Sequence, residues 1–300
     1  MLLDIVSVFP DYFSILNLSL LGKAQADGLV EVRAHNLRDW THDVHHSVDD
    51  TPVGGGAGMV MKPEIWASCL DELLGMPALT VDASAQAMAN ATADLASSFS
   101  SGYAPDYQPS SSPADDEKPV LIFPDPSAPL FTQAAAQELS RHHHLVFGCG
   151  RYEGIDARVG QYYAAQGVDV REYSLGDYVL NGGGVAVCVM IEAITRLIPG
   201  FMGNPDSIVD ESYTGEPLLE HRQFTRPTTW RGLSVPPILT SGDHAKVDRF
   251  RRDEKLVRTN AVRPDLIEKL DTHSLDKADR KLLMSLGWDV SGEHPRRARK

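Results

Sequence analysis

Residues 145–156 read Leu-Val-Phe-Gly-Cys-Gly-Arg-Tyr-Glu-Gly-Ile-Asp, an apolar run followed by a turn with three glycines. The apolar run predicts a buried strand, and residues 155–165 predict a helix directly after the turn. Backbone N–H groups at such a strand-to-helix turn can bind a ligand. The turn from Gly148 to Gly154 is therefore a candidate binding loop. The alternative is a tight structural turn in which Glu153 and Asp156 supply charges to the first turn of the helix.

The chain on both sides of this turn alternates between strand and helix patterns. Strands are predicted at Leu2–Val8, Val120–Phe123 and Val168–Tyr173, and helices at Thr132–His142 and Val185–Leu197. This alternation predicts an α/β fold with a parallel sheet covered by helices on both faces. Ligands of such sheets bind beyond the carboxyl ends of the strands, which is where the glycine-rich loops of this sequence fall.

Two further glycine clusters are candidates for close approach of the backbone to a ligand. Ser174-Leu-Gly-Asp-Tyr-Val-Leu-Asn-Gly-Gly-Gly184 follows a predicted strand, and its three consecutive glycines allow a ligand or another segment to pass very near. Asp177 is alternatively a turn residue that accepts local hydrogen bonds. Gly54-Gly-Gly-Ala-Gly58 follows His45-His-Ser-Val-Asp-Asp50 and is either part of a site or a flexible loop.

Composition and charge restrict the class of protein. The 300 residues are 42% hydrophobic and 23% charged, which is typical of a globular chain of one or two domains. The net charge of -13 argues against binding nucleic acid through the overall field, so that any such contact must be a local patch. One candidate patch contains Lys246, Arg249, Arg251, Arg252, Lys255, Arg258 and Arg263. Asp248, Asp253 and Glu254 lie among them, so the alternative is a solvated helix face with ion pairs.

The remaining segments suggest how the chain is organised. Residues 83–118 are rich in Ala, Ser, Asp and Pro and predict a flexible acidic insertion. The N-terminus has no basic stretch before its apolar residues, and no apolar run reaches the length of about 18 residues that a membrane span needs. Cys69, Cys149 and Cys188 are too widely spaced for a metal clip, and their odd number fits a reducing cytoplasm. His142-His-His144 predicts exposed polar side chains rather than a metal site.

Several of these motifs together resemble one protein family. Residues 48–59, Val-Asp-Asp-Thr-Pro-Val-Gly-Gly-Gly-Ala-Gly-Met, Gly150-Arg-Tyr-Glu-Gly-Ile-Asp156, Ser174-Leu-Gly-Asp-Tyr-Val-Leu180, and the run from Tyr213 through Thr225-Arg-Pro227 to Val235-Pro-Pro237 are similar to the bacterial tRNA (guanine-N1-)-methyltransferase family. The likeness covers almost the whole chain outside the insertion and the tail.

The resemblance implies a fold and a methyl donor. The family is homodimeric and of the SPOUT class, in which a deep trefoil knot binds S-adenosylmethionine. The resemblance thus implies three parts of the chain: a knotted donor-binding domain over residues 1–200, an interdomain linker at 201–214, and a small, mostly helical tRNA-binding domain with a basic tail at 215–300. By resemblance the donor contacts are Phe123, Pro124, Pro126, Gly150, Tyr152, Glu153, Ser174, Leu175, Gly176, Asp177, Tyr178, Val179, Leu180, Gly182 and Gly183.

The chemistry requires a base and a cation. N1 of guanine is a weak acid, so a positioned carboxylate is its natural general base, and the charge that then spreads to O6 would be stabilised by an arginine. By resemblance this arginine is Arg196, and the base is an Asp directly before a Ser in the linker. Here Glu211 precedes Ser212, and Asp210 lies one residue earlier. We favour Asp210, because the extra methylene of Glu211 would overshoot the site; two linker carboxylates without a catalytic role are the remaining alternative.

The family's substrate contacts fall on the linker, the N-terminal glycine loop and the basic run. By resemblance the residues that bind the tRNA anticodon arm are Asp50, Gly56, Ser212, Arg249 and Arg252. The sequence departs from the family at Gly184, where relatives have Glu, and at Val53, where Tyr is common. Magnesium dependence is left open, since no metal-ligand cluster in the sequence supports it.

The sequence therefore predicts a cytoplasmic, homodimeric enzyme without a membrane anchor. It would transfer a methyl group from S-adenosylmethionine to guanine N1 at position 37 of tRNA, next to the anticodon. Two alternatives belong to other classes. Gly148-Cys-Gly150 suggests a nucleotide-dependent oxidoreductase, although the third glycine comes one residue late for a dinucleotide fingerprint. The basic run by itself suggests a non-catalytic RNA-binding module.

Overall fold

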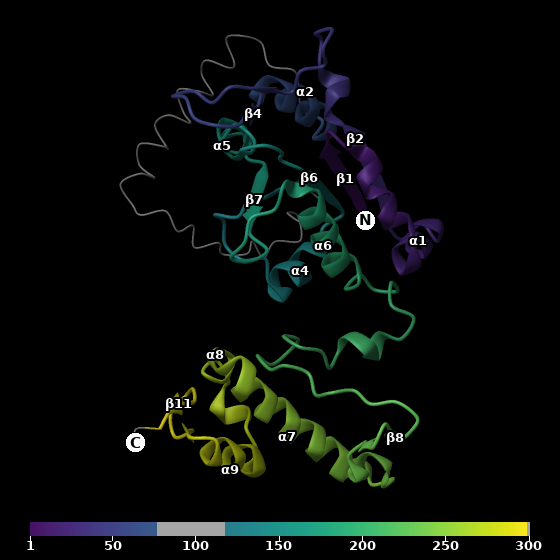
Figure 1. Cartoon of the computed structure of the whole chain (residues 1–300), viewed down its shortest axis with the longest axis vertical. Coiled ribbons are helices and arrows are strands. Elements are labelled where there is room, and N and C mark those ends of the chain that lie inside the picture. The colour runs from purple at the N-terminus through teal and green to yellow at the C-terminus, as the bar shows by residue number, and fades with distance from the viewer. Residues whose placement is uncertain (77–117, 299–300) are drawn as a thin grey trace. The chain divides into compact units, whose positions relative to one another are not determined.

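The computed structural model describes residues 1–76 and 118–298, except for the side chains of residues 205 and 206 (Figure 1). The described chain divides into two compact units, Met1–Gly203 and Asn204–Lys300. The acidic insertion predicted at 83–118 lies outside the described residues apart from Lys118. Each unit is described by itself below.

The N-terminal unit is built on a five-stranded sheet in the order β2-β1-β6-β5-β7, in which every neighbouring pair is parallel. Its strands are β1 (Leu2–Ser7), β2 (Glu31–Asn36), β5 (Val120–Pro124), β6 (His144–Gly148) and β7 (Asp169–Tyr173). The prediction of an α/β fold with a parallel sheet is confirmed. The edge strand β2 was not predicted, because it carries polar side chains that are exposed or half-buried and has no apolar run.

Helices cover both faces of this sheet (Figure 1). Side chains alternate along a strand, so Val120 and Ile122 pack on one face while Leu121 and Phe123 pack on the other. The first face is covered by η1 (Pro10–Asn17), α1 (Ser19–Ala26), α4 (Gln133–Leu139) and α6 (Gly183–Thr195). The second is covered by η2 (Leu37–Trp40), α2 (Pro63–Leu73) and α5 (Arg158–Ala165). Two cores with the sheet between them result.

Local chemistry sets where these helices begin. Thr132 caps α4, because its side chain accepts a hydrogen bond of 3.3 Å from the backbone N–H of Ala135. Pro63 occupies the first turn of α2, where its missing N–H removes no helical hydrogen bond. The sequence analysis did not predict α2, although Trp66 and Cys69 on its inner face are fully buried. The short strands β3 (Asp49–Asp50) and β4 (Val60–Met61) pair antiparallel, and the loop Gly54–Gly58 connects them.

The C-terminal unit is mainly helical over its second half. After η3 (Pro205–Ile208) come a hairpin of β8 (Thr229–Trp230) and β9 (Leu233–Ser234), then η4 (Pro237–Thr240), α7 (His244–Val262), α8 (Pro264–Ile267), η5 (Thr272–Ser274), α9 (Lys277–Ser285), β10 (Trp288–Asp289) and β11 (Arg296–Arg297). Leu256, Ile267, Leu283 and Trp288 are buried together in its core. Asp243 and Asp276 cap α7 and α9 by accepting backbone N–H groups.

Candidate functional site

A cavity of about 410 Å³ lies at the carboxyl ends of β5, β6 and β7 in the N-terminal unit. Its walls come from the loop after β5, the loop between β6 and α5, and the loop between β7 and α6. These are the strand ends at which a parallel sheet binds ligands. The volume lies within the range of about 300–1,000 Å³ typical of small-molecule sites.

The donor-contact residues expected from the resemblance meet at this cavity. Gly176 and Asp177 are not among the residues that line it, although both belong to the loop that forms one wall. The others line it: Phe123, Pro124, Pro126, Gly150, Tyr152, Glu153, Ser174, Leu175, Tyr178, Val179, Leu180, Gly182 and Gly183. Segments that are as much as 60 residues apart in the sequence, from Phe123 to Gly183, therefore line one cavity.

The two glycine loops touch through their backbones. The N–H of Gly183 donates a hydrogen bond of 2.9 Å to the carbonyl of Gly150, and Arg151 and Gly182 form an antiparallel bridge. A Cβ atom at Gly183 would lie 3.0 Å from the Cα atom of Cys149. A side chain at position 183 would therefore push the loops apart, which explains why glycine occurs there.

The N-terminal glycine cluster also reaches the cavity wall. The N–H of Glu153 donates to the carbonyl of Met59 at 3.0 Å, and the N–H of Met61 donates to the carbonyl of Gly154 at 2.9 Å. A Cβ atom at Gly58 would collide with the side chain of Glu153. The segment 58–61 thus runs along the loop that carries Glu153, as the sequence analysis allowed but could not decide.

Several carboxyl groups give the cavity an acidic lining that suits a cation. Desolvation, with a smaller contribution from nearby Asp125, raises the pKa of Glu172. The pKa of Asp156 is lowered, first by a hydrogen bond from the Arg158 guanidinium. Asp125 and Glu153 line the cavity as well. Asp156 is already paired with Arg158, and Arg151 also lines the cavity, so Asp125, Glu153 and Glu172 are the carboxyl groups that can attract a positively charged part of a ligand.

Sequence reasoning missed part of the lining. Arg151 and Gly154 line the cavity within the predicted binding loop Gly148–Gly154, and Asp125 lines it between the expected Pro124 and Pro126. The lining residues that were not expected are Ser127, Ile155, Asp156, Ala157, Gly160, Glu172, Tyr173 and Ala186. Most of them are neighbours of expected residues, and adjacency along the loops could have identified them. Gly160 on α5 and Glu172 on β7 carry no motif, and only the packing of α5 beside β7 brings them to the site.

Comparisons with known proteins agree with the geometry. A sequence model of the tRNA (Guanine-1)-methyltransferase TrmD family matches residues 1–100 and 108–269. The chain belongs to this family. It is similar to the tRNA (guanine-N(1)-)-methyltransferases of Bifidobacterium adolescentis (73% identical over 305 residues) and Bifidobacterium longum (70% over 300), with 99% of each chain covered. That of Thermobifida fusca is 49% identical over 296 residues, with 98% of each chain covered. The family resemblance found from the sequence is confirmed.

The linker carboxylates expected for this family lie in the C-terminal unit. The side chain of Asp210 is 67% exposed and forms an ion pair with Nζ of Lys255 on α7. Ser212 accepts a hydrogen bond of 2.8 Å from the N–H of Glu220 through its hydroxyl. The carbonyl of Glu211 accepts from the N–H of Thr214 at 3.3 Å.

Arg196, the cation expected for the developing charge on guanine, is the C-cap residue of α6. It lines a shallow surface of the N-terminal unit together with Val185, Cys188, Val189, Glu192 and Ala193, all from α6. Asp50, on β3, and Gly56, in the loop after it, are both exposed. Neither lines the cavity described above.

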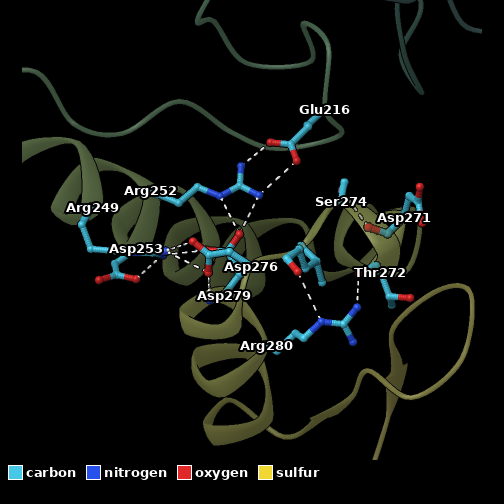
Figure 2. A network of polar contacts seen from close by, with 11 residues as sticks. Glu216, Arg249, Arg252, Asp253, Asp271, Thr272, Ser274, Asp276, Asp279 and Arg280 are labelled. Atoms are coloured by element: carbon cyan, nitrogen blue, oxygen red, sulfur yellow. Dashed lines mark hydrogen bonds and ion pairs between the residues drawn. The ribbon is translucent and has the colours of Figure 1, made fainter. Parts of the chain in front are cut away.

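The arginines expected to contact RNA phosphates instead lie in a carboxylate network (Figure 2). Arg249 donates to Asp253, Asp276 and Asp279, and its side chain is 29% exposed. Arg252 donates to Asp279 and is paired with Glu216. These contacts favour the alternative interpretation of α7, in which ion pairs neutralise the basic run. A role of Arg249 and Arg252 in substrate binding stays a prediction.

The prediction of exposed histidines holds for His143 but is wrong for His142, which is buried, and for His144, the half-buried first residue of β6. His142 is buried, and its Nε2 lies 3.1 Å from a carboxylate oxygen of Glu138. His144 and His35 lie 2.7 and 2.6 Å from the two oxygens of Asp4, which is buried in β1. The described residues contain no group of three His, Cys, Asp or Glu side chains that could hold a metal ion. Among the same residues, no helix has the length and apolarity to cross a membrane.

Proposed function

We propose that this chain transfers a methyl group from S-adenosylmethionine to N1 of a guanine in tRNA, at position 37 next to the anticodon. The observation that carries the proposal is the cavity at the carboxyl ends of β5, β6 and β7, in a chain of this methyltransferase family. A reaction on tRNA, with free cysteines in the chain, fits a cytoplasmic enzyme.

The cavity suits the chemistry of the donor. Gly150, Gly182 and Gly183 leave the backbone open, so an adenosine can approach its N–H and carbonyl groups. Tyr178 and Leu180 offer apolar surface to a purine ring, and the carboxylates of Asp125 and Glu153 complement a sulfonium charge. When bound, S-adenosylmethionine supplies a methyl group on a positively charged sulfur, which is a good leaving group.

The close crossing of the glycine loops supports a trefoil knot of the SPOUT type. The backbone around Gly183 lies against Cys149 and Gly150 with no room for a side chain. Leu130 and Ser174 form a further parallel bridge, so the loop after β5 and the end of β7 are also joined. We propose that one of these loops threads through another, which would hold the cavity walls in a fixed arrangement.

The linker would supply the base. We propose that Asp210 accepts the N1 proton of guanine, with Glu211 as the alternative; N1 then attacks the methyl carbon as its bond to sulfur breaks. The products are N1-methylguanine and S-adenosylhomocysteine, and the proton ends on the carboxylate. We favour Asp210 over Glu211 because the extra methylene of Glu211 would overshoot the site, and small displacements cost large factors in rate. Arg196 would stabilise the negative charge that develops at O6.

An apolar surface of the N-terminal unit supports a homodimer. Tyr12 and Ile15 on η1 are exposed by 52% and 58%, and Val185 and Val189 on α6 by 44% and 48%. The ring of Tyr12 lies near Gly184, so the surfaces of η1 and α6 are continuous. Contiguous exposed apolar patches mark protein interfaces. We propose that a second copy of the chain covers this patch.

Mass spectrometry of tRNA incubated with the enzyme and labelled methyl donor tests the activity, because it locates the modified base. Calorimetry with S-adenosylhomocysteine tests the cavity separately. We expect saturable binding and a label on guanine N1. Absence of saturable binding by the purified protein would exclude the proposed use of the cavity.

Variants of the linker test the base. Asp210→Asn is expected to lower kcat by about 100-fold or more while S-adenosylhomocysteine still binds. Glu211→Gln distinguishes the two carboxylates, and Asp248→Asn, at an exposed carboxylate on α7, is the control. Unchanged methylation by the double variant at Asp210 and Glu211 would remove both residues as candidates.

A further inference from the structure

The segment of residues 221–242 in the C-terminal unit, here called the acid-free segment, differs from the rest of this acidic protein. It contains no Asp and no Glu, although the whole chain has 41 acidic residues and a net charge of -13. Its cations are Arg222, Arg226 and Arg231, and its aromatic residues are Phe224 and Trp230. Basic residues interleaved with aromatic ones are typical of surfaces that bind single-stranded nucleic acid.

A tight hairpin presents the centre of this segment to solvent. Trp230 on β8 pairs with Leu233 on β9, so the turn consists of Arg231 and Gly232 alone. Their φ angles are +51° and +81°, as a two-residue turn of the type I′ class requires. Asn is the favoured residue at the first of these positions, and an arginine there lies in a strained conformation. Its position in the turn places Arg231 at the tip of the hairpin.

The side chains at this tip form an open cation–aromatic pair. The Cζ atom of Arg231 lies 4.8 Å from the centroid of the Trp230 ring. Trp230 is 58% exposed and Leu233 is 71% exposed, so neither is covered by the rest of the described unit. A second arginine lies over a tryptophan in the same unit, where Arg297 is 4.1 Å from the Trp288 ring. Trp288 is only 1% exposed and offers no free face.

The charges at the tip are also not neutralised. Arg222, at the start of the segment, pairs with Glu254. Among the carboxylates in the described part of the chain, none lies within ion-pair distance of Arg226 or Arg231. Two positive charges and an open indole ring therefore share one exposed segment. A polyanion with flat aromatic groups is the partner that matches both properties.

We propose that the acid-free segment is a tRNA-binding surface of this protein, in which Trp230 and Arg231 stack against an unpaired nucleobase and Arg226 contacts a phosphate. The proposal rests on tRNA being the substrate. It assigns RNA contact to a segment outside the basic run of α7. Bases in RNA loops stack on aromatic rings and guanidinium planes, and such stacking is tolerant of the base identity.

Equilibrium binding of unmethylated tRNA to the full-length protein tests this assignment. Trp230→Ala is expected to raise the Kd by about 10-fold, as expected for the loss of one stacked base. Arg231→Ala is expected to raise it as well, and Arg226→Ala is expected to reduce the slope of log K against log salt by about 1. Arg297→Ala is the matched control for an arginine over a tryptophan, and Met284→Ala, at a side chain 63% exposed, is the control for lost apolar surface.

The readouts separate this proposal from the proposed function. Wild-type affinity of both tip variants, in an enzyme that methylates tRNA, would overturn the proposal and leave the function intact. If the two tip variants lose tRNA affinity but the wild-type protein methylates no guanine, the proposal stands and the proposed function fails. Sedimentation of each variant completes the test: a change of oligomeric state in Trp230→Ala would mean that the segment binds a second copy of the chain, which also overturns the proposal.

Discussion

Two arginine-rich regions of the C-terminal unit have opposite surroundings. On α7, Arg249 and Arg252 are surrounded by carboxylates and are largely covered. In the acid-free segment, Trp230 and Arg231 lie open to solvent. A guanidinium that already donates to two or three carboxylates has few N–H groups left for a phosphate. The surroundings of an arginine, rather than the local number of arginines, therefore determine whether its guanidinium is available to a phosphate.

The largest expected effect comes from removing the carboxylate shared by the two paired arginines. The side chain of Asp279 is 4% exposed and accepts hydrogen bonds from both Arg249 and Arg252. Asp279→Asn would leave two guanidinium groups without their common partner, at a cost of about 3 kcal/mol in the stability of this unit. Hydrogen exchange of the α7 amides measures it. Asp248→Asn, on the exposed face of α7, is the control. A loss of stability in Asp279→Asn no larger than in this control would show that the carboxylates around Arg249 and Arg252 do not stabilise the unit.

A buried carboxylate in the N-terminal unit is a second case in which the partners of a charged group determine its state, and here the effect depends on pH. Burial by itself raises the pKa of Asp4, but hydrogen bonds from His144 and His35 outweigh burial and lower it from 3.8 to about 2. Because the folded pKa is the lower one, the stabilisation is present above pH 4 and is lost as the pH falls towards 2. The loss is about 2 kcal/mol.

Urea unfolding between pH 5 and pH 2.5, followed by circular dichroism, checks this prediction. The free energy of unfolding should change less with pH in Asp4→Asn, which has no titrating carboxyl at this position. Identical pH profiles of the variant and the wild type would show that the two histidines do not hold Asp4 as a carboxylate.

The smallest expected effect tests whether the absence of Asp and Glu from the acid-free segment contributes to tRNA affinity. Thr228 is exposed, and its backbone carbonyl accepts a hydrogen bond of 2.9 Å from the N–H of Val235 beside the hairpin. Thr228→Glu keeps this bond and introduces one negative charge, so tRNA affinity should fall about 3-fold at low salt and recover part of the difference at high salt. Thr228→Gln is the neutral control. Equal Kd values for the two variants would remove the charge argument for this segment.

The fold and the cavity could be predicted in large part because their causes are local. The apolar run at Val120–Phe123 forms a strand buried on both faces, and Thr132 begins a helix through its own side chain. The carboxyl ends of parallel strands lie at one edge, so the loops with Gly150 and Gly183 had to meet there. The polar edge strand β2 and the helix α2 were missed, because the sheet and core that hold them come from distant segments.

The sequence by itself determined the parallel sheet, the family and the loops that line the cavity, since these follow from periodicity and from glycines at strand ends. How the charged side chains far apart in the sequence are paired depends on the tertiary structure. Arg249 reaches Asp276 and Asp279 across 27 and 30 residues, and His144 reaches Asp4 across 140. Arg231 lies nine residues after Arg222 in the same segment, yet of these two only Arg222 has a carboxylate partner, Glu254, among the residues that the structure describes. Partners far apart along the chain meet only when the chain folds, so pairing, and with it the ability to bind RNA, cannot be read from composition.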